Sequence, residues 1–308
     1  MRRIPLAALA CVLTFCVFRG TSARADTTPL EAKSTSSAIL GAEGLYVGAL
    51  PPPGFYLIDY TLYYRATEFH GRHGGEVNSP PFTDFDAWAV ANVVRGVYVA
   101  DTTILGANPA WHVIVPFVHK SVSSNFFDQD QTGIGDIYVS PLILGWHRPP
   151  WHWAAGMDII MPTGEYHKGN VANIGNNHWT FEPAAALSYI GESGFMADTK
   201  LMYDFHTEDP ALDYHEGQQF HMDYNVGYAF GAQKQWRAGI CGYYLTSLQD
   251  DQSHEKTIHG SKEKVFAIGP SLSYQLGRLS IEMKVQKEVM AQNRPEGVAT
   301  WLKLIYAF

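Results

Sequence analysis

The chain has 308 residues, with 22 basic and 30 acidic side chains and a formal net charge of −8. This acidic balance argues against nucleic acid as a partner, because the phosphate backbone requires a basic surface. Three cysteines are too few for a disulfide scaffold, and the length suits one large domain or two smaller ones.

The N-terminal residues predict export. Arg2 and Arg3 precede an apolar run over residues 4–18, which is shorter than the roughly 20 residues that a membrane-spanning helix needs. Small residues then fit a signal-peptide cleavage site, so we expect residues 1–25 to be removed between Ala25 and Asp26. The chain that remains would have 18 basic and 30 acidic residues, a net charge of −12, and would keep only Cys241.

Residues 26–53 form a segment of small residues that ends in "PPPG". Proline cannot donate a backbone hydrogen bond, so it is tolerated before a strand but not inside a central one. We expect this segment to lie on the periplasmic side of the strands that come after it in the chain. One hypothesis is that it folds back as a plug.

From residue 54 onward, apolar and polar residues alternate with a period of two, which indicates β-strands, and no later run of 18 apolar residues predicts a transmembrane helix. We expect about 12 strands. They lie near residues 54–66, 86–100, 110–118, 134–146, 151–161, 177–190, 194–206, 217–229, 235–248, 263–276, 278–290 and 299–308.

The lengths of the connections alternate along the chain. "HRPP", "GES", "GAQKQ" and "LGR" come after even-numbered strands, whereas long polar segments come after odd-numbered ones. Short periplasmic turns opposite long outer loops are typical of an outer-membrane barrel, and a soluble sandwich has no reason to sort its loops in this way. The sequence therefore predicts an all-β fold, a closed antiparallel transmembrane β-barrel over residues 54–308.

Tryptophans and the last strand support this prediction. Trp146, Trp151 and Trp153 flank one short turn and Trp236 comes after another, as expected of rings at the headgroup level. The final strand, "WLKLIYAF", ends in Phe308 and looks suited to closing the sheet and to engaging the barrel-assembly machinery. Closure matters because lipid offers no partner for unpaired backbone groups.

In the first strand, Tyr56, Ile58 and Tyr60 share one face, which we expect to meet lipid. The opposite face, with Asp59 and Arg65, would then meet the lumen. The same alternation in the other strands predicts a polar lumen. Its side chains either line a solute path or only brace the barrel. The predicted lumen residues are Asp59, Arg65, Glu182, Asp198, Lys200, Asp204, His206, His221, Asp223, Arg237, Lys264, Glu282, Lys284 and Lys303.

No motif predicts a catalytic, cofactor or metal site. Three groups of polar residues only approach metal-binding patterns, because their spacings do not fit a known loop or helix motif. They are His70 with His73, His254 with His259, and Asp128 and Asp130 with Gly133. An alternative is a lipid-hydrolysing barrel, for which Ser188, Ser247 and Ser271 are candidate nucleophiles only because they lie in strands.

Several stretches resemble one known family. They are "EGLYVGALPPPGFYLIDYTLYY", "GIGDIYVSPLILGWH", "PTGEYHKGNVANIGNNHWTFEPAAALSY", "LQDD" ending at Asp251, and "AIGPSLSY" from Ala267. The chain is similar to the family named for the MetA pathway of phenol degradation, whose members look like outer-membrane barrels.

The resemblance implies a channel in the outer membrane of a Gram-negative bacterium, in contact with lipid and lipopolysaccharide. It implies the uptake of small hydrophobic or aromatic compounds, without a cofactor. Phenylalanines of the long loops would capture the solute, namely Phe82, Phe85, Phe126 and Phe127. A third alternative is a structural barrel that transports nothing.

Overall fold

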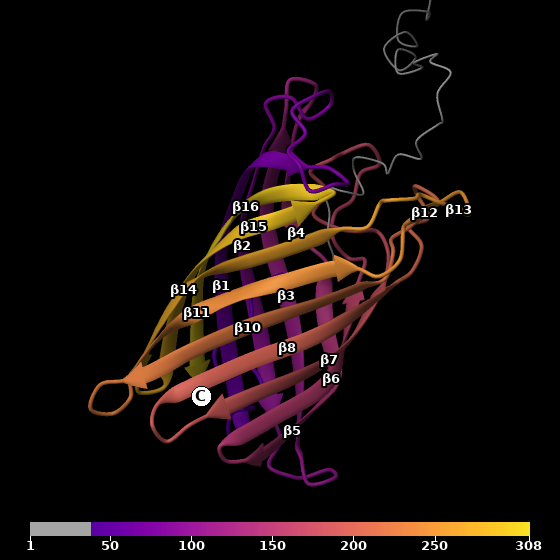
Figure 1. Ribbon diagram of the computed structural model, residues 1–308. Coiled ribbons are helices and arrows are strands. Elements are labelled where there is room, and N and C mark those ends of the chain that lie inside the picture. Colours follow the sequence, from indigo (N-terminus) through magenta and orange to yellow (C-terminus); the bar gives the residue numbers. More distant parts are fainter. Residues whose placement is uncertain (1–37) are drawn as a thin grey trace, which may run out of the picture.

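The computed structural model describes residues 38–308 and is built of β-strands (Figure 1). Their bounds are β1 Gly54–His70, β2 Asp86–Val99, β3 Asn108–Ser123, β4 Asp128–Ile134, β5 Ile137–Arg148, β6 Trp151–Met161, β7 Thr180–Ile190, β8 Phe195–His206, β9 Tyr214–His215, β10 Gln219–Phe230, β11 Trp236–Ser247, β12 Gln252–Ser253, β13 Lys256–Thr257, β14 Lys264–Leu276, β15 Leu279–Gln292 and β16 Arg294–Ala307. No helix within residues 38–308 is long and apolar enough to cross a membrane.

One antiparallel sheet of 13 strands closes on itself. Along β1, Tyr60 lies opposite Val93 of β2 on one side and Lys303 of β16 on the other, so the first strand joins the last. β4 and β5 both pair with β3, one after the other, and together form one interrupted strand of the wall. The wall is therefore a closed barrel of twelve strands, which confirms the predicted fold class.

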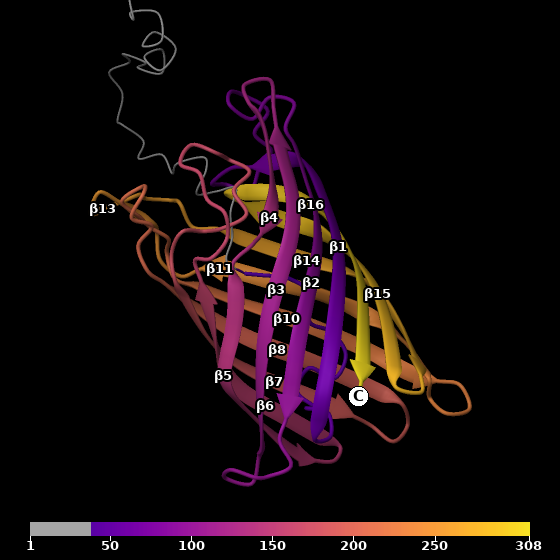
Figure 2. The same ribbon diagram turned by 180° about the vertical axis from the view of Figure 1, so that it is seen from behind.

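The two ends of the barrel differ. At one end, which we call the short-turn end, consecutive wall strands are joined by the short links 149–150, 191–194, 231–235 and 277–278. Figures 1 and 2 place the C-terminus at this end. The opposite, long-loop end carries segments 71–85, 162–179, 207–218 and 248–263. Within these loops β9, β12 and β13 form a small separate sheet.

One expected long loop is mostly strand. Asp128, Asp130 and Gly133 lie on β4, which pairs with β3 from Phe117 to Ser123, so these residues do not form a cation-binding loop. The sequence did not predict this strand, because the hairpin extends the wall toward the long-loop end and both of its faces carry polar residues there.

The outer face is apolar, and aromatic rings gather near its ends. Near the short turns, Trp151, Trp153 and Trp236 are 46%, 36% and 38% exposed. Indole rings at this level combine an apolar body with a polar N–H and suit the headgroup region of a bilayer.

The assignment of the faces of β1 was wrong. Tyr60 is buried against Trp301, and Phe55 and Leu57 are exposed. Consequently Asp59 and Arg65 lie on the outer face, where Asp59 accepts a hydrogen bond from Asn92 and Arg65 pairs with Asp86 at 3.0 Å. Alternation separates the two faces of a strand but does not say which one meets lipid when both carry apolar groups.

Candidate solute passage in the barrel lumen

Residues 38–53 lie inside the barrel and bond to its inner face. The amides of Gly41 and Glu43 donate to the Asp223 carboxylate at 3.0 and 2.9 Å. Further along, the amide of Tyr46 donates to Asp198 at 2.9 Å, and the amide of Gly48 donates to Ser188 Oγ at 2.9 Å. We call residues 38–53 the lumenal segment.

Lys284 holds the same segment from the opposite side. Its Nζ donates to the carbonyl oxygens of Gly41, Ala42 and Glu43 at 2.6, 3.0 and 2.8 Å. The lysine is 1% exposed, so the three carbonyls replace the water that its ammonium group has lost. A carboxylate from β10 and an ammonium group from β15 therefore fix the backbone of the segment between two walls.

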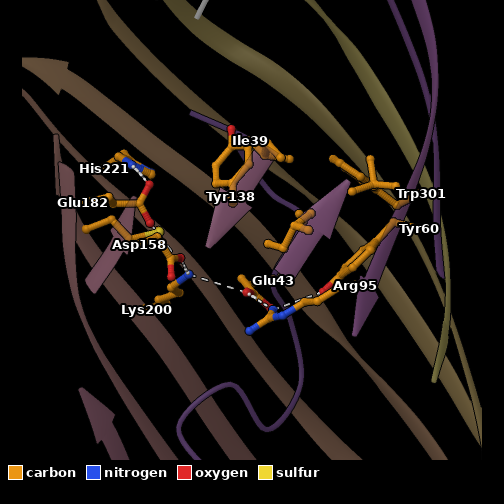
Figure 3. A pocket seen from close by; sticks show the side chains of 14 residues that line it. Ile39, Glu43, Tyr60, Arg95, Tyr138, Asp158, Glu182, Lys200, His221 and Trp301 are labelled. Carbon is orange, nitrogen blue, oxygen red and sulfur yellow. Dashed lines mark hydrogen bonds and ion pairs between the residues drawn. The ribbon is translucent and has the colours of Figure 1, made fainter. Parts of the chain in front are cut away.

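The side chain of Glu43 lies at the centre of a cluster of cations (Figure 3). Its carboxylate is 2.8 Å from Arg95 Nη1, 3.5 Å from Lys200 Nζ and 3.7 Å from Lys303 Nζ. These partners come from β2, β8 and β16, and all four side chains are at most 14% exposed. One carboxylate of the lumenal segment thus pairs with cations from three strands.

A second set of charges continues from this cluster toward β10. Asp158 lies 2.9 Å from His112 and 3.8 Å from Lys200, and Glu182 lies 3.9 Å from Lys200. On the far side of Glu182, His221 Nε2 is 3.3 Å away. Together with the Glu43 cluster, these groups form a charged belt that narrows the lumen at the depth drawn in Figure 3.

Cavities lie on both sides of the charged belt. Toward the short turns a cavity of about 680 Å³ is bounded by the lumenal segment and by residues such as Val97, Ile143 and Lys303. Toward the long loops a cavity of about 300 Å³ is mainly apolar, and we call it the upper chamber. Its apolar lining includes Ile39, Leu62, Ala91, Val93, Val118, Ala299 and Trp301.

Loop 162–179 borders the upper chamber through Asn173, Ile174 and Asn176, and beside them it packs into a separate apolar cluster. Val171 and Ala172, from segment 162–179, are buried against Phe69 and Phe85, and Phe82 stacks on Phe69 with ring centroids 3.8 Å apart. Phe127 packs against the same cluster, whereas Phe126 is 57% exposed. Of the four predicted capture residues, only Phe126 is largely accessible at the surface.

The structure brings eleven of the 14 predicted lumen residues to the inner face. Ten have buried or nearly buried side chains, and Arg237 lies 4.8 Å from the Tyr46 ring in the lumenal segment. These residues are Glu182, Asp198, Lys200, Asp204, His206, His221, Asp223, Arg237, Glu282, Lys284 and Lys303.

Asp59, Arg65 and Lys264 lie outside the lumen and correct the prediction. Lys264 shares its strand face with the exposed Ile268 and Leu272, opposite the buried Val265 and Ala267. A bulge in β15 beside Phe266 and Ala267 shifts the register there. The predicted cleavage site at Ala25 and Asp26 falls outside the described residues.

Five residues of the chamber and the belt were missed by the sequence prediction. They are Glu43, Arg95, His112, Asp158 and Trp301. Arg95 lies in a strand whose polar and apolar residues alternate poorly, and Glu43 precedes the first strand. Arg95 and Asp158 are isolated charges within apolar strands, and this feature of the sequence could have indicated that they face the lumen.

The three candidate serines bond to groups other than histidine. Ser188 Oγ donates to Asp198, Ser247 Oγ accepts from the amide of Glu263, and Ser271 Oγ donates to Asn225. None of these bonds forms the serine–histidine pair on which the lipid-hydrolase alternative depends.

The comparison with known proteins decides the family. The family described as "Putative MetA-pathway of phenol degradation" matches residues 69–304, which is most of the chain. The chain belongs to this family. A search of curated proteins finds no match.

Solved structures show the same fold. The COG4313 outer membrane channel from Pseudomonas putida F1 superposes with a TM-score of 0.75 at 15% identity, over 85% of this chain and 97% of that one. The NanC porin gives a TM-score of 0.42 at 10% identity, covering 82% of this chain and 100% of that one. A FadL homologue from Pseudomonas aeruginosa gives 0.44 at 8% identity, covering 82% and 90%. The family member is therefore built like an outer-membrane barrel.

Proposed function

We propose that this protein is a channel of the Gram-negative outer membrane, with its short turns in the periplasm, and that it admits small hydrophobic or aromatic molecules. The observation that carries the proposal is the upper chamber, a mainly apolar cavity of about 300 Å³ on the long-loop side of the charged belt. An apolar solute gains free energy on leaving water for such a cavity. The family name, with its reference to phenol degradation, supports the same class of solute.

The lining of the chamber favours aromatic alcohols within this class. The indole Nε1 of Trp301 has no hydrogen-bond partner among the described residues, although the side chain is only 2% exposed. A buried N–H without a partner is costly, so a solute oxygen that reached the chamber would gain a donor. Phenol combines an apolar ring with such an oxygen.

Passage beyond the chamber requires the lumenal segment to move. The segment contributes Ile39 to the wall of the chamber and Glu43 to the charged belt below it. We propose that residues 38–53 act as a plug. Ion pairs and hydrogen bonds hold it in addition to apolar contacts of Ile39, Leu40 and Leu50, and water entering the lumen would weaken the ion pairs. No cofactor is needed for this passive route.

Filling the chamber tests the proposal. Ala299 is 3% exposed and lines the chamber, so Ala299→Phe places a ring where the solute would lie. Liposomes containing purified protein should take up phenol faster than protein-free liposomes, and the variant should remove most of the difference. Ala185→Phe adds the same ring to the exposed outer face of β7 and serves as the control.

Equal uptake with and without the wild-type protein would contradict transport and leave the structural barrel as the explanation. Equal uptake by wild type and Ala299→Phe would exclude the upper chamber from the route.

A further inference from the structure

A buried cluster of two histidines and one glutamate lies at the long-loop end, outside the charged belt. His178 ends the loop 162–179, His206 ends β8, and Glu216 lies in the loop before β10. Their exposed fractions are 7%, 6% and 8%. One ligand atom from each, an Nε2 of either histidine and Oε2 of the glutamate, lies within 4.8 Å of the other two.

The distances in this cluster suit a small divalent cation. His178 Nε2 is 3.6 Å and His206 Nε2 is 4.0 Å from Glu216 Oε2. Ligands held about 2.0–2.1 Å from a tetrahedral zinc ion lie about 3.3 Å from one another. The two histidine–glutamate distances exceed this value by less than 1 Å, so small side-chain shifts would bring Glu216 Oε2 to ligand spacing from either ring.

Neighbouring groups bond to the remaining polar atom of each of these three side chains, as groups around a metal site orient its ligands. His178 Nδ1 lies 3.3 Å from the carbonyl of Trp179 and 3.5 Å from the Thr180 hydroxyl. A neutral ring that donates to this carbonyl through Nδ1 would have its lone pair on Nε2. His206 Nδ1 pairs with the Thr180 hydroxyl at 2.9 Å. Gln219 donates to Glu216 Oε1 at 2.7 Å and so directs Oε2 toward the histidines.

One of the three inward-facing atoms has no partner. His206 Nε2 is buried and makes no hydrogen bond within residues 38–308. Burying a ring nitrogen without a partner costs free energy, which a metal ion would recover. In the neighbouring cluster His221 Nε2 also makes no hydrogen bond, but it lies 3.2 and 3.3 Å from two carboxylates and belongs to the charged belt.

We propose that His178, His206 and Glu216 form a binding site for a divalent metal of the zinc class. Three protein ligands of nitrogen and oxygen type suit Zn²⁺ and leave one coordination position for water. The ion would tie two loops to the end of β8. It would thereby fix the loop 162–179, whose Asn173, Ile174 and Asn176 line the upper chamber.

The test is zinc binding by the full-length protein in detergent, purified without a histidine tag and freed of metals by a chelator. Calorimetric titration with zinc sulfate should show one tight site per chain. His178→Ala removes a loop ligand and leaves the barrel wall intact, and we expect it to weaken this site at least 100-fold. Glu216→Gln, a nearly isosteric change, should also weaken it strongly.

The control is the pair His147 and His152 near a short turn at the opposite end, whose Nδ1 atoms lie 2.9 Å apart. Replacing both by alanine should leave the tight site unchanged. X-ray absorption of the zinc complex should show two imidazole ligands and oxygen ligands. Heat-modifiable migration on gels checks that each variant is folded.

Three results would overturn the site: no tight binding by the wild type, equal binding by folded His178→Ala, or loss of binding in the His147→Ala/His152→Ala control. Zinc should also raise the unfolding temperature of the wild type by several degrees and leave that of the folded His178→Ala variant unchanged.

Discussion

Trp301 joins the two regions that matter for solute passage. Its ring packs edge-on against Tyr60 at 6.4 Å, borders both the upper chamber and the charged belt, and lies 5.8 Å from Lys284 Nζ. Lys284 in turn holds the lumenal segment. A solute that contacts Trp301 would therefore touch a side chain next to Lys284, which holds the lumenal segment.

Trp301→Phe tests whether the indole N–H recognises a hydroxyl group. The change keeps an aromatic ring in the chamber and removes the donor, so phenol should lose one neutral hydrogen bond, about 0.5–1.5 kcal/mol. Half-saturation of phenol uptake by liposomes should then rise about two- to tenfold. Toluene, which has no hydroxyl group, serves as the matched solute and should be unaffected. An equal change for both solutes would mean that only the shape of the chamber matters.

At the residue scale, the alternation of polar and apolar residues predicted many of the side chains that line the lumen but not which of them contact one another. Lys200, Asp223 and Lys284 were predicted inside because polar residues alternate with apolar ones along their strands. Their partners could not be predicted, because Glu43 precedes the barrel and meets Arg95 and Lys200 only after the sheet has closed.

At the scale of elements, the lumenal segment depends on close backbone approach. A Cβ at Gly48 would lie 2.6 Å from the backbone nitrogen of Ser188 and 2.7 Å from the carbonyl carbon of Leu187. Only glycine fits here, since β7 cannot move without disturbing its ladders to β6 and β8. The segment is thus held by contact with one wall as well as by its ion pairs.

Gly48→Ala should push this part of the segment off β7. Overpacking of this kind costs about 1–3 kcal/mol, which would populate displaced states of the segment and raise solute uptake severalfold. Gly75→Ala is the control, because a Cβ there meets nothing within 4 Å. Single-channel recording in planar bilayers would report the same change as longer open times. Unchanged uptake and unchanged conductance would show that residues 38–53 do not limit passage.

The elements themselves differ in how far sequence predicts them. Strands such as β8 and β15 alternate cleanly and were found at nearly their observed bounds, Phe195–His206 and Leu279–Gln292. β4 was missed because its residues are polar on both faces. The plug hypothesis came from the small residues of the segment, and its contacts could not be predicted, since its bonds to the wall reach residues 52 to 243 positions away.

At the scale of the whole molecule, the seam between β1 and β16 decides whether the sheet is a barrel. Fourteen residue pairs register across it, from Tyr56↔Ala307 to His70↔Arg294, with one bulge. At the short-turn end the amide of Phe308 donates to the carbonyl of Phe55 at 3.1 Å, and the two rings lie 5.4 Å apart. These contacts pin the edge that would otherwise be open, and an open edge is not tolerated in lipid.

Phe308→Ala tests this seam, and with it our proposal that the barrel-assembly machinery engages the chain through β16. The variant loses an exposed ring that packs on Phe55 and Tyr306, so less protein should close and insert. We expect a severalfold lower amount of heat-modifiable protein in the outer-membrane fraction. Phe230→Ala is the matched control, because this ring is 45% exposed at the same end but lies away from the seam. Equal loss in both variants would point to general membrane anchoring by aromatic rings, and no loss in either would show that backbone pairing alone secures closure.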